Sequence, residues 1–319
     1  MRRLILTILF ATAAGAACAQ SYPSRPLRML IHFPPGGATD IVGRIISPPL
    51  AEKLGQPVVV ENRPGAGGAV AAEIAAKAAP DGHTLLIAGT SSVLGLNVVM
   101  IPNLPYKPSD LASITRLVTS PFIVAVNTSL IPATSIRELI AALKAKPRQP
   151  FASGGTASGM HLAGEFFRSL AGVDMYHVPY KGNGPAMSDL SGGQIPIAFV
   201  DLGSTASYAK STRVKVLAVA ARERTAMAPD IPSALESGLP GWEATGSFGL
   251  VTAVATPRPI IMRLNREMTD ILKMPEVRTR ILATNNEPAP TSPEEYDAFI
   301  KSEVTKWTKV ITEANIKFE

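Results

Sequence analysis

Short apolar runs alternate with segments of helical periodicity along most of the chain, and each apolar run of the first series ends in a turn rich in glycine or hydroxyl groups. Residues 27–33 are followed by PPGGATD and a helical pattern, and residues 57–61 by ENRPGAGG and another. Residues 84–88 then lead into GTSS. This alternation is typical of parallel α/β units. After a proline-rich loop, the pattern predicts two separate strands, near 113–119 and 121–127.

A second series of the same kind begins with a helix near 135–145. Ser135, followed three residues later by Glu138, predicts a capping box at the start of this helix. The elements that follow repeat the plan of the first series, and the tail of the chain is helical. Further strands are predicted near 150–153, 175–179, 195–200 and 214–220, with helices near 39–54, 68–78, 159–171, 184–191, 257–272, 275–283 and 293–314.

The two series predict an α/β fold made of two doubly wound domains of similar plan. We expect domain one to comprise residues 20–124 and 247–319, and domain two to comprise residues 125–246. The two crossings would form a two-strand hinge with the ligand cleft between the domains. The strand order in each domain is expected to begin 2-1-3, which places the loops after the first and third strands nearest the cleft. The C-terminal helices are expected to pack on domain one.

The N-terminus has the composition of a secretory leader. Two arginines precede an apolar run of 14 residues, Leu4 to Ala17, which is too short and too rich in alanine for a membrane span. Cleavage is expected before Gln20, so residues 1–19 form a predicted signal peptide and the mature chain lacks cysteine. A lipoprotein acylated at Cys18 is the alternative.

Two glycine-rich turns, 34–40 and 153–158, each open a helix. The first N–H groups of a helix lack intrahelical partners and the helix dipole favours negative charge there, so such a turn binds anions readily. Together with the inner loops 89–92 and 201–204, the turns contain no lysine or arginine, so neutral donors would hold the anion. The predicted ligand-binding residues are Pro35, Gly36, Gly37, Ala38, Thr39, Asp40, Thr90, Ser91, Ser153, Gly155, Thr156, Ala157, Ser158, His161 and Asp201.

Several of these residues also have a purely structural interpretation. Thr39 and Thr156 are placed to cap their helices. Asp40 is placed to complement the dipole of its helix, and His161 to make a structural hydrogen bond. Asp201 ends an apolar strand at the predicted cleft, where a carboxylate would repel an anion unless the ligand also carried an ammonium or hydroxyl donor.

Composition and motifs argue against other functions. The net charge of +6 falls to +4 without the two leader arginines, and the excess forms no basic stripe, so nucleic-acid binding is not expected. The chain has no complete G-x-G-x-x-G, P-loop or G-x-S-x-G motif, and its four histidines include no H-E-x-x-H. We therefore expect no enzyme activity, no cofactor and no metal.

Several long motifs, in the same order along the chain, resemble the Bug family of extracytoplasmic solute receptors, which belong to tripartite tricarboxylate transporter systems. They include LRMLIHFPPGGATD, LGQPVVVENRPGAGG, APDGHTLLIAGT, FASGGTASGMHLAGE and HVPYKGNGPAMSDLSGGQI. The resemblance implies a type II-like periplasmic-binding-protein fold. It also implies a ligand whose carboxylates are held by residues 35–40 and 153–158, partly through water. Ala157 stands where the family often has glycine.

The resulting hypothesis is a monomeric periplasmic solute-binding protein that captures a carboxylate-bearing small molecule by domain closure. It would deliver this solute to the membrane subunits of a tripartite tricarboxylate transporter. The solute would be a dicarboxylate, a tricarboxylate, an acidic amino acid or an aromatic acid, and the sequence does not say which. A periplasmic sensor subunit that binds the same solutes for a membrane signalling kinase is the alternative. A secreted enzyme such as an esterase is disfavoured because no activated nucleophile is recognisable.

Overall fold

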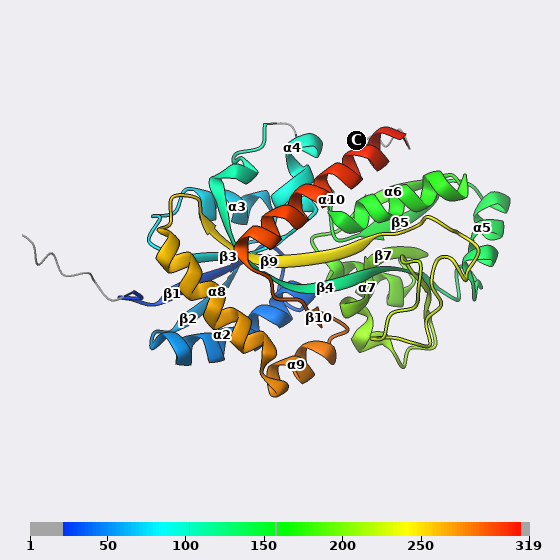
Figure 1. Cartoon of the computed structure of the whole chain (residues 1–319). Coiled ribbons are helices and arrows are strands. Elements are labelled where there is room, and N and C mark those ends of the chain that lie inside the picture. The colour runs from blue at the N-terminus through cyan, green and yellow to red at the C-terminus, as the bar shows by residue number, and fades with distance from the viewer. Residues whose placement is uncertain (1–21, 102, 157, 314–319) are drawn as a thin grey trace, which may run out of the picture.

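The computed structural model describes residues 22–101, 103–156 and 158–313, coloured along the chain in Figure 1. The predicted leader, with its cleavage site before Gln20, lies outside these residues, and so does Ala157. The strands are β1 (Leu27–Ile31), β2 (Val58–Asn62), β3 (Thr84–Gly89), β4 (Leu111–Asn127), β5 (Gln149–Ser153), β6 (Met175–Pro179), β7 (Ile197–Asp201), β8 (Val214–Val219), β9 (Thr245–Ala253) and β10 (Glu287–Pro288). The helices are α2 (Ala38–Leu54), α3 (Ala69–Ala76), α4 (Asn97–Met100), α5 (Ile136–Ala145), α6 (Gly159–Ala171), α7 (Asn183–Gly192), α8 (Arg258–Lys273), α9 (Pro275–Leu282) and α10 (Pro293–Glu313), with short turns η1 (Ala66–Gly68), η2 (Ser92–Leu96), η3 (Pro108–Asp110) and η4 (Leu202–Tyr208).

The described strands form one mixed sheet in the order β2-β1-β3-β9-β4-β7-β5-β6, and β8 and β10 also pair with β4. β1 is parallel to β2 and β3, and β5 is parallel to β6 and β7. The predicted 2-1-3 order of the first three strands is therefore confirmed in both series. We call β1–β3 and β9 with helices α2, α3, α8 and α9 the first unit, and β5–β8 with helices α5–α7 the second unit.

β4 joins the two units as one continuous strand, so the prediction of two strands in this region was wrong. It pairs antiparallel with β9 as far as Pro121, and with β7 and β8 from Phe122 onward. A proline has no N–H to donate, which is why the sequence suggested a break there. Because Pro121 lies where one set of partners ends and the next begins, the strand continues through it. Figure 1 shows β4 and β9 running side by side through the middle of the molecule, from one unit to the other.

Local signals determine two helix ends, and the cap of the second was predicted. Gly55 ends α2 in the left-handed conformation, with φ of 70°, and its N–H bonds the carbonyls of Ala51 and Glu52. Ser135 caps α5, and its hydroxyl accepts from the N–H of Glu138. The other half of the predicted capping box differs, because the Glu138 carboxylate accepts from the N–H of Thr134 rather than from that of Ser135.

The C-terminal helix α10 contacts both units. Its Tyr296 is fully buried in an apolar cluster that contains residues of β1, β3 and α3. Further along, Trp307 is buried in the main cluster of the second unit and meets the ring of Phe166 edge-on, with ring centroids 6.2 Å apart. The C-terminal helices were expected to pack on domain one, and α8 and α9 do so. α10 instead runs across from one unit to the other, as Figure 1 shows.

Candidate ligand-binding site

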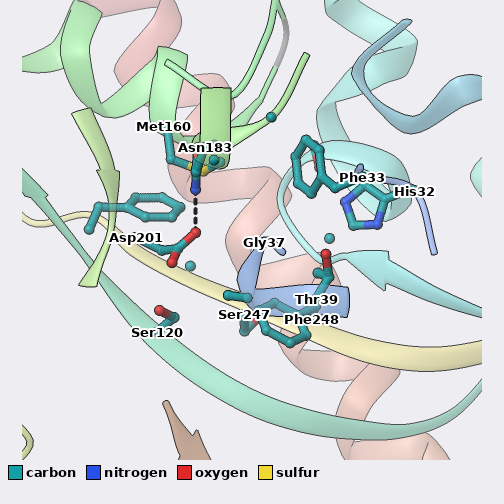
Figure 2. A pocket seen from close by; sticks show the side chains of 18 of the residues that line it. His32, Phe33, Gly37, Thr39, Ser120, Met160, Asn183, Asp201, Ser247 and Phe248 are labelled. Atoms are coloured by element: carbon teal, nitrogen blue, oxygen red, sulfur yellow. Dashed lines mark hydrogen bonds between the residues drawn. The ribbon is translucent and has the colours of Figure 1, made fainter. Parts of the chain in front are cut away.

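A pocket lies between the two units at the carboxyl ends of β1, β3 and β7. Residues of the crossing strands β4 and β9 form its floor, as Figure 2 shows. It contains about 650 Å³ of empty space, part of it open to solvent. Its polar lining consists of His32, Thr39, Thr90, Ser91, Ser92, Ser120, Asn183, Asp201 and Ser247. Its apolar lining includes Phe33, Pro35, Phe122, Met160 and Phe248. Among the described residues that line it there is no lysine or arginine.

The first glycine turn presents the N-terminus of α2 to this pocket. Gly37 is the N-cap and has no side chain to bond the first N–H groups of the helix, and Gly37 and Ala38 line the pocket. The first intrahelical bond is that of the Ile41 N–H to the Gly37 carbonyl. The N–H groups of Ala38, Thr39 and Asp40 therefore have no intrahelical acceptor and are available to an anion.

Thr39 does not cap α2, because it lies inside the first turn of the helix and Gly37 is the N-cap. Its side chain is 3% exposed, lines the pocket, and has no hydrogen-bond partner for Oγ1 among the described residues. A buried hydroxyl without a partner is energetically unfavourable, so a partner from a ligand or a water is expected there.

Asp40 holds the turn in shape rather than lining the pocket. One carboxylate oxygen accepts from the N–H of Gly36 at 3.0 Å, and the other accepts from Asn62 Nδ2 at 2.9 Å. Arg44 forms an ion pair with the same carboxylate at 3.0 Å. Burial alone would raise the pKa of Asp40, but the bonds from Arg44, Gly36 and Asn62 hold this pKa below its usual value. Gly36 likewise belongs to the turn and not to the pocket wall.

His32, directly after β1, offers the pocket a hydrogen-bond acceptor. Its Nδ1 lies 2.9 Å from the carbonyl oxygen of Ile87, and because a carbonyl only accepts, Nδ1 carries the proton. Burial lowers the pKa of His32 to about 4, so the ring is neutral at pH 7. Nε2 therefore has a lone pair, and it has no partner among the described residues.

The hydroxyls after β3 are already engaged. Ser247 Oγ donates to Thr90 Oγ1 at 2.7 Å, and Thr90 Oγ1 lies 2.9 Å from the hydroxyl of Tyr296. Ser91 Oγ donates to Oε2 of Glu303 at 3.1 Å. Thr90 and Ser91, which were predicted as ligand-binding residues, line the pocket, but their side chains connect it to α10. Ser120, on β4, has a buried hydroxyl without a partner in the described structure.

Asp201 lies on the wall that the second unit contributes. Its Oδ1 accepts from the N–H and the hydroxyl of Ser204, both at 2.8 Å, and its Oδ2 accepts from Asn183 Nδ2. Figure 2 shows the Asn183–Asp201 pair facing the space above β4 and β9. Burial raises the pKa of this carboxyl, while the donors of Ser204 and Asn183 act against that rise. Each of these hydrogen bonds is donated to the carboxylate, so Asp201 acts as an acceptor.

The second glycine turn does not reach the same pocket. Ser153 Oγ lies 2.7 Å from His177 Nε2, and Ser158 caps α6 by accepting from the N–H of His161. The His161 ring stacks on His177 with centroids 3.7 Å apart. His161 is buried and His177 is partly buried, and this loss of solvation lowers the pKa of His161 to about 4 and that of His177 to about 3. Ser153, Ser158 and His161 therefore stabilise the turn and its helix.

Gly155 and Thr156 line a second, outer pocket on the other side of His32 and Phe33. Thr156 is not a helix cap, because Ser158 is the N-cap of α6. The structure thus brings Pro35, Gly37, Ala38, Thr39, Thr90, Ser91 and Asp201 together at the inner pocket. It places Gly155 and Thr156 at the outer one.

Five polar residues of the inner pocket were missed from the sequence, namely His32, Ser92, Ser120, Asn183 and Ser247. His32 and Ser120 have unpartnered buried atoms, and Asn183 bonds Asp201. His32 could have been found, because it directly follows a strand whose carboxyl end was expected at the cleft. Ser120 stood at the predicted break between two strands, and the loop containing Asn183 was expected further out.

A family model described as a tripartite tricarboxylate transporter family receptor matches residues 42–316. The chain belongs to this family. Protein BugT of Bordetella pertussis is 34% identical over 325 residues, which cover 100% of this chain and 99% of that protein. The resemblance to the Bug family is therefore confirmed, and a member of this receptor family is a solute-binding protein rather than an enzyme.

Solved structures of similar proteins have the same fold, which is that of periplasmic binding proteins. Rpa4515 of R. palustris, solved with adipate, is 28% identical with a TM-score of 0.87, covering 92% of this chain and 99% of its own. MatC of Rhodopseudomonas palustris, solved with bound malate, is 30% identical with a TM-score of 0.86, covering 91% of this chain and 100% of its own.

The described residues contain no cluster of histidine, cysteine, aspartate or glutamate suited to a metal ion. Within the same part of the chain, none of the helices has both the length and the apolar character needed to span a bilayer.

Proposed function

We propose that this protein is a periplasmic receptor that binds a carboxylate-bearing small molecule in the inner pocket and delivers it to a membrane transporter. The observation that carries the proposal is the uncapped N-terminus of α2 beside the unpartnered hydroxyl of Thr39. Several neutral donors there, each contributing about 0.5–1.5 kcal/mol net, can hold one carboxylate without a cation. The adipate and malate in the two solved relatives are both carboxylates, which supports this ligand class.

The arrangement of the strands supports capture by closure. We propose that residues 20–124 and 247–319 move as one domain and residues 125–246 as the other. The chain crosses between the units on β4 and again at the start of β9, and the pocket residues Ser120 and Gly246 lie at these crossings. A ligand that touches both units would favour the closed arrangement by its differential contacts. The predicted signal peptide before Gln20 would bring the chain to the periplasm as a monomer.

A thermal-shift screen of refolded, ligand-free protein against carboxylates tests the proposal. A ligand at 100 times its Kd stabilises the native state by about 2.7 kcal/mol, which for a chain of this size raises Tm by roughly 5 °C. The variant Thr39→Val should lose most of this shift, and Thr39→Ser should keep it. Thr308→Val, the same chemical change at an exposed position of α10, is the matched control. If no carboxylate raises Tm, or if Thr39→Val binds like the wild type, the proposed site is wrong.

A further inference from the structure

The inner pocket is not a uniform anion site, because it has acceptors as well as donors. The first unit contributes the N–H groups at the start of α2 and the Thr39 hydroxyl. The pocket also contains two acceptors, which are the carboxylate of Asp201 and the lone pair on Nε2 of His32. Figure 2 shows the Asp201–Asn183 pair and the His32 ring on opposite sides of the space. Carboxylates provide only acceptors, so a plain dicarboxylate gives the lone pair of His32 no donor and brings a second acceptor group toward the Asp201 carboxylate.

The negative charge of Asp201 makes the binding of a plain dicarboxylate especially unfavourable. It is 7% exposed, and none of the described residues that line the pocket is a lysine or arginine that could neutralise it. Asn183 and Ser204 supply hydrogen bonds but no positive charge. A second carboxylate brought against this wall would meet a like charge in a poorly solvated space, which is unfavourable. A hydroxyl or ammonium group would instead find an acceptor.

Nε2 of His32 is likewise restricted to the role of a hydrogen-bond acceptor. Its Nδ1 proton is committed to the Ile87 carbonyl, so Nε2 cannot become a donor while the ring is neutral. The ring is held by its bond to Ile87 and by the ring of Phe33, whose centroid lies 4.3 Å from its own. Nε2 therefore remains an acceptor without a donor in the described protein.

We propose that the solute carries one or more hydroxyl or ammonium groups in addition to its carboxylate, and that Asp201 and Nε2 of His32 are the acceptors for such donors. The carboxylate lies at the start of α2. This inference rests on the proposed function and narrows it, since it selects hydroxy- and amino-carboxylates over plain diacids. Asp201 thereby acts as a specificity-determining residue.

The test compares acids that share one carbon skeleton. We would measure Kd by isothermal titration on refolded wild-type protein for three sets: succinate, malate and aspartate; propanoate, lactate and alanine; adipate and 2-aminoadipate. In the set whose length fits the pocket, the member with a donor should bind at least 10-fold more tightly than its plain counterpart, as expected for one hydrogen bond to a buried charged group.

The variant Asp201→Asn tests the residue itself. Its amide can keep accepting from Ser204, and the charge that repels a second carboxylate is gone. The plain diacid should gain at least 10-fold in affinity over its wild-type value, and the amino acid should lose its advantage. Glu223→Gln, which removes one negative charge at an exposed site, should change neither.

The outcomes separate this inference from the proposed function. If no acid of any set binds, the carboxylate receptor itself is wrong. If plain diacids bind as tightly as, or more tightly than, their hydroxy and amino counterparts, the receptor stands and the inference is overturned. An unchanged ranking in a folded Asp201→Asn variant also overturns it. Should that variant fail to fold, the wild-type series still decides.

Discussion

The hydroxyl of Ser91, on the pocket wall, donates to Oε2 of Glu303, on the C-terminal helix 212 residues further along the chain. The same oxygen accepts from Nε1 of Trp307 at 3.1 Å. Glu303 is 8% exposed and Trp307 is fully buried, so one carboxylate oxygen joins the loop after β3 to the part of α10 that packs on the second unit. The wall of the pocket is thereby tied to a helix that contacts both units.

We expect Glu303→Leu to destabilise the protein by about 2–4 kcal/mol, because it leaves two buried donors without an acceptor. Glu303→Gln keeps an acceptor oxygen and should lose less than half as much. Urea unfolding followed by Trp fluorescence measures both variants. Equal stability of Glu303→Leu and the wild type would show that the two hydrogen bonds contribute nothing net.

The pairing of Arg28 with Glu61 predicts a pH dependence of stability. The two side chains meet through two bonds, of 2.8 and 3.0 Å, and the hydrogen bond from Arg28 is the main cause that lowers the pKa of Glu61 to about 2. A carboxyl whose folded pKa is lowered stabilises the protein above its unfolded pKa of about 4.3, and this contribution is lost as the pH falls toward the folded value.

Both side chains are partly exposed, so solvent screening limits the contribution to about 1 kcal/mol. Glu61→Gln should therefore be less stable than the wild type at pH 7, and the gap should close between about pH 4.3 and pH 2. Urea titrations at pH 7, 4 and 3 measure the gap. A gap that stays constant across this range would contradict the assignment.

Gly249, on β9, lies against the ring of Tyr296. A Cβ added there would approach the ring and hydroxyl of Tyr296 to 2.4–2.5 Å, and this tyrosine is fully buried and bonded to Thr90. We expect Gly249→Ala to lower the free energy of unfolding by about 1–3 kcal/mol through overpacking. Gly192→Ala, in α7 where nothing lies within 4 Å, is the matched control and should be neutral or slightly stabilising. A Tm for Gly249→Ala equal to that of the control would show that Tyr296 moves aside freely.

The cap of α5 gives a further quantitative expectation. Ser135→Ala removes the acceptor for the Glu138 N–H and should lower the free energy of unfolding by about 1 kcal/mol. Ser135→Asp retains an acceptor at the same place and should be close to the wild type. Chemical denaturation of the three proteins under identical conditions measures this. A loss of equal size in both variants would point to packing rather than capping.

Features fixed by a few neighbouring residues could be predicted from the sequence. The ends of α2 and α5 depend on Gly55 and Ser135, and the strand order follows from the alternation of strands and helices. The continuity of β4 could not be predicted, because it depends on Pro121 standing where partners from distant parts of the chain change. Sequence spacing contains no information about that register.

The site residues also divide into those fixed by neighbouring residues, which could be predicted, and those fixed by distant parts of the chain, which could not. The glycine turn before α2 was predicted from its own composition. The position of Ser153 depends on its contact with His177, and that of Asp40 on Asn62, which come from other strands. Thr39 and Thr156 occupy similar places in two similar turns, but only Thr39 reaches the inner pocket. The difference arises from how the second unit is placed against the first.

The position of β9 between β3 and β4 determines the order in which the sheet can be completed. β1, β2 and β3 come first in the chain, but the strand that covers the free edge of β3 begins only at Thr245. β5 to β8 precede that strand, and so does their partner β4, so the second unit can complete its sheet while the first still exposes an apolar edge. Unpaired edges of this kind are sites of aggregation. The edge of β3 is therefore open to pairing with another chain until β9 has joined the sheet.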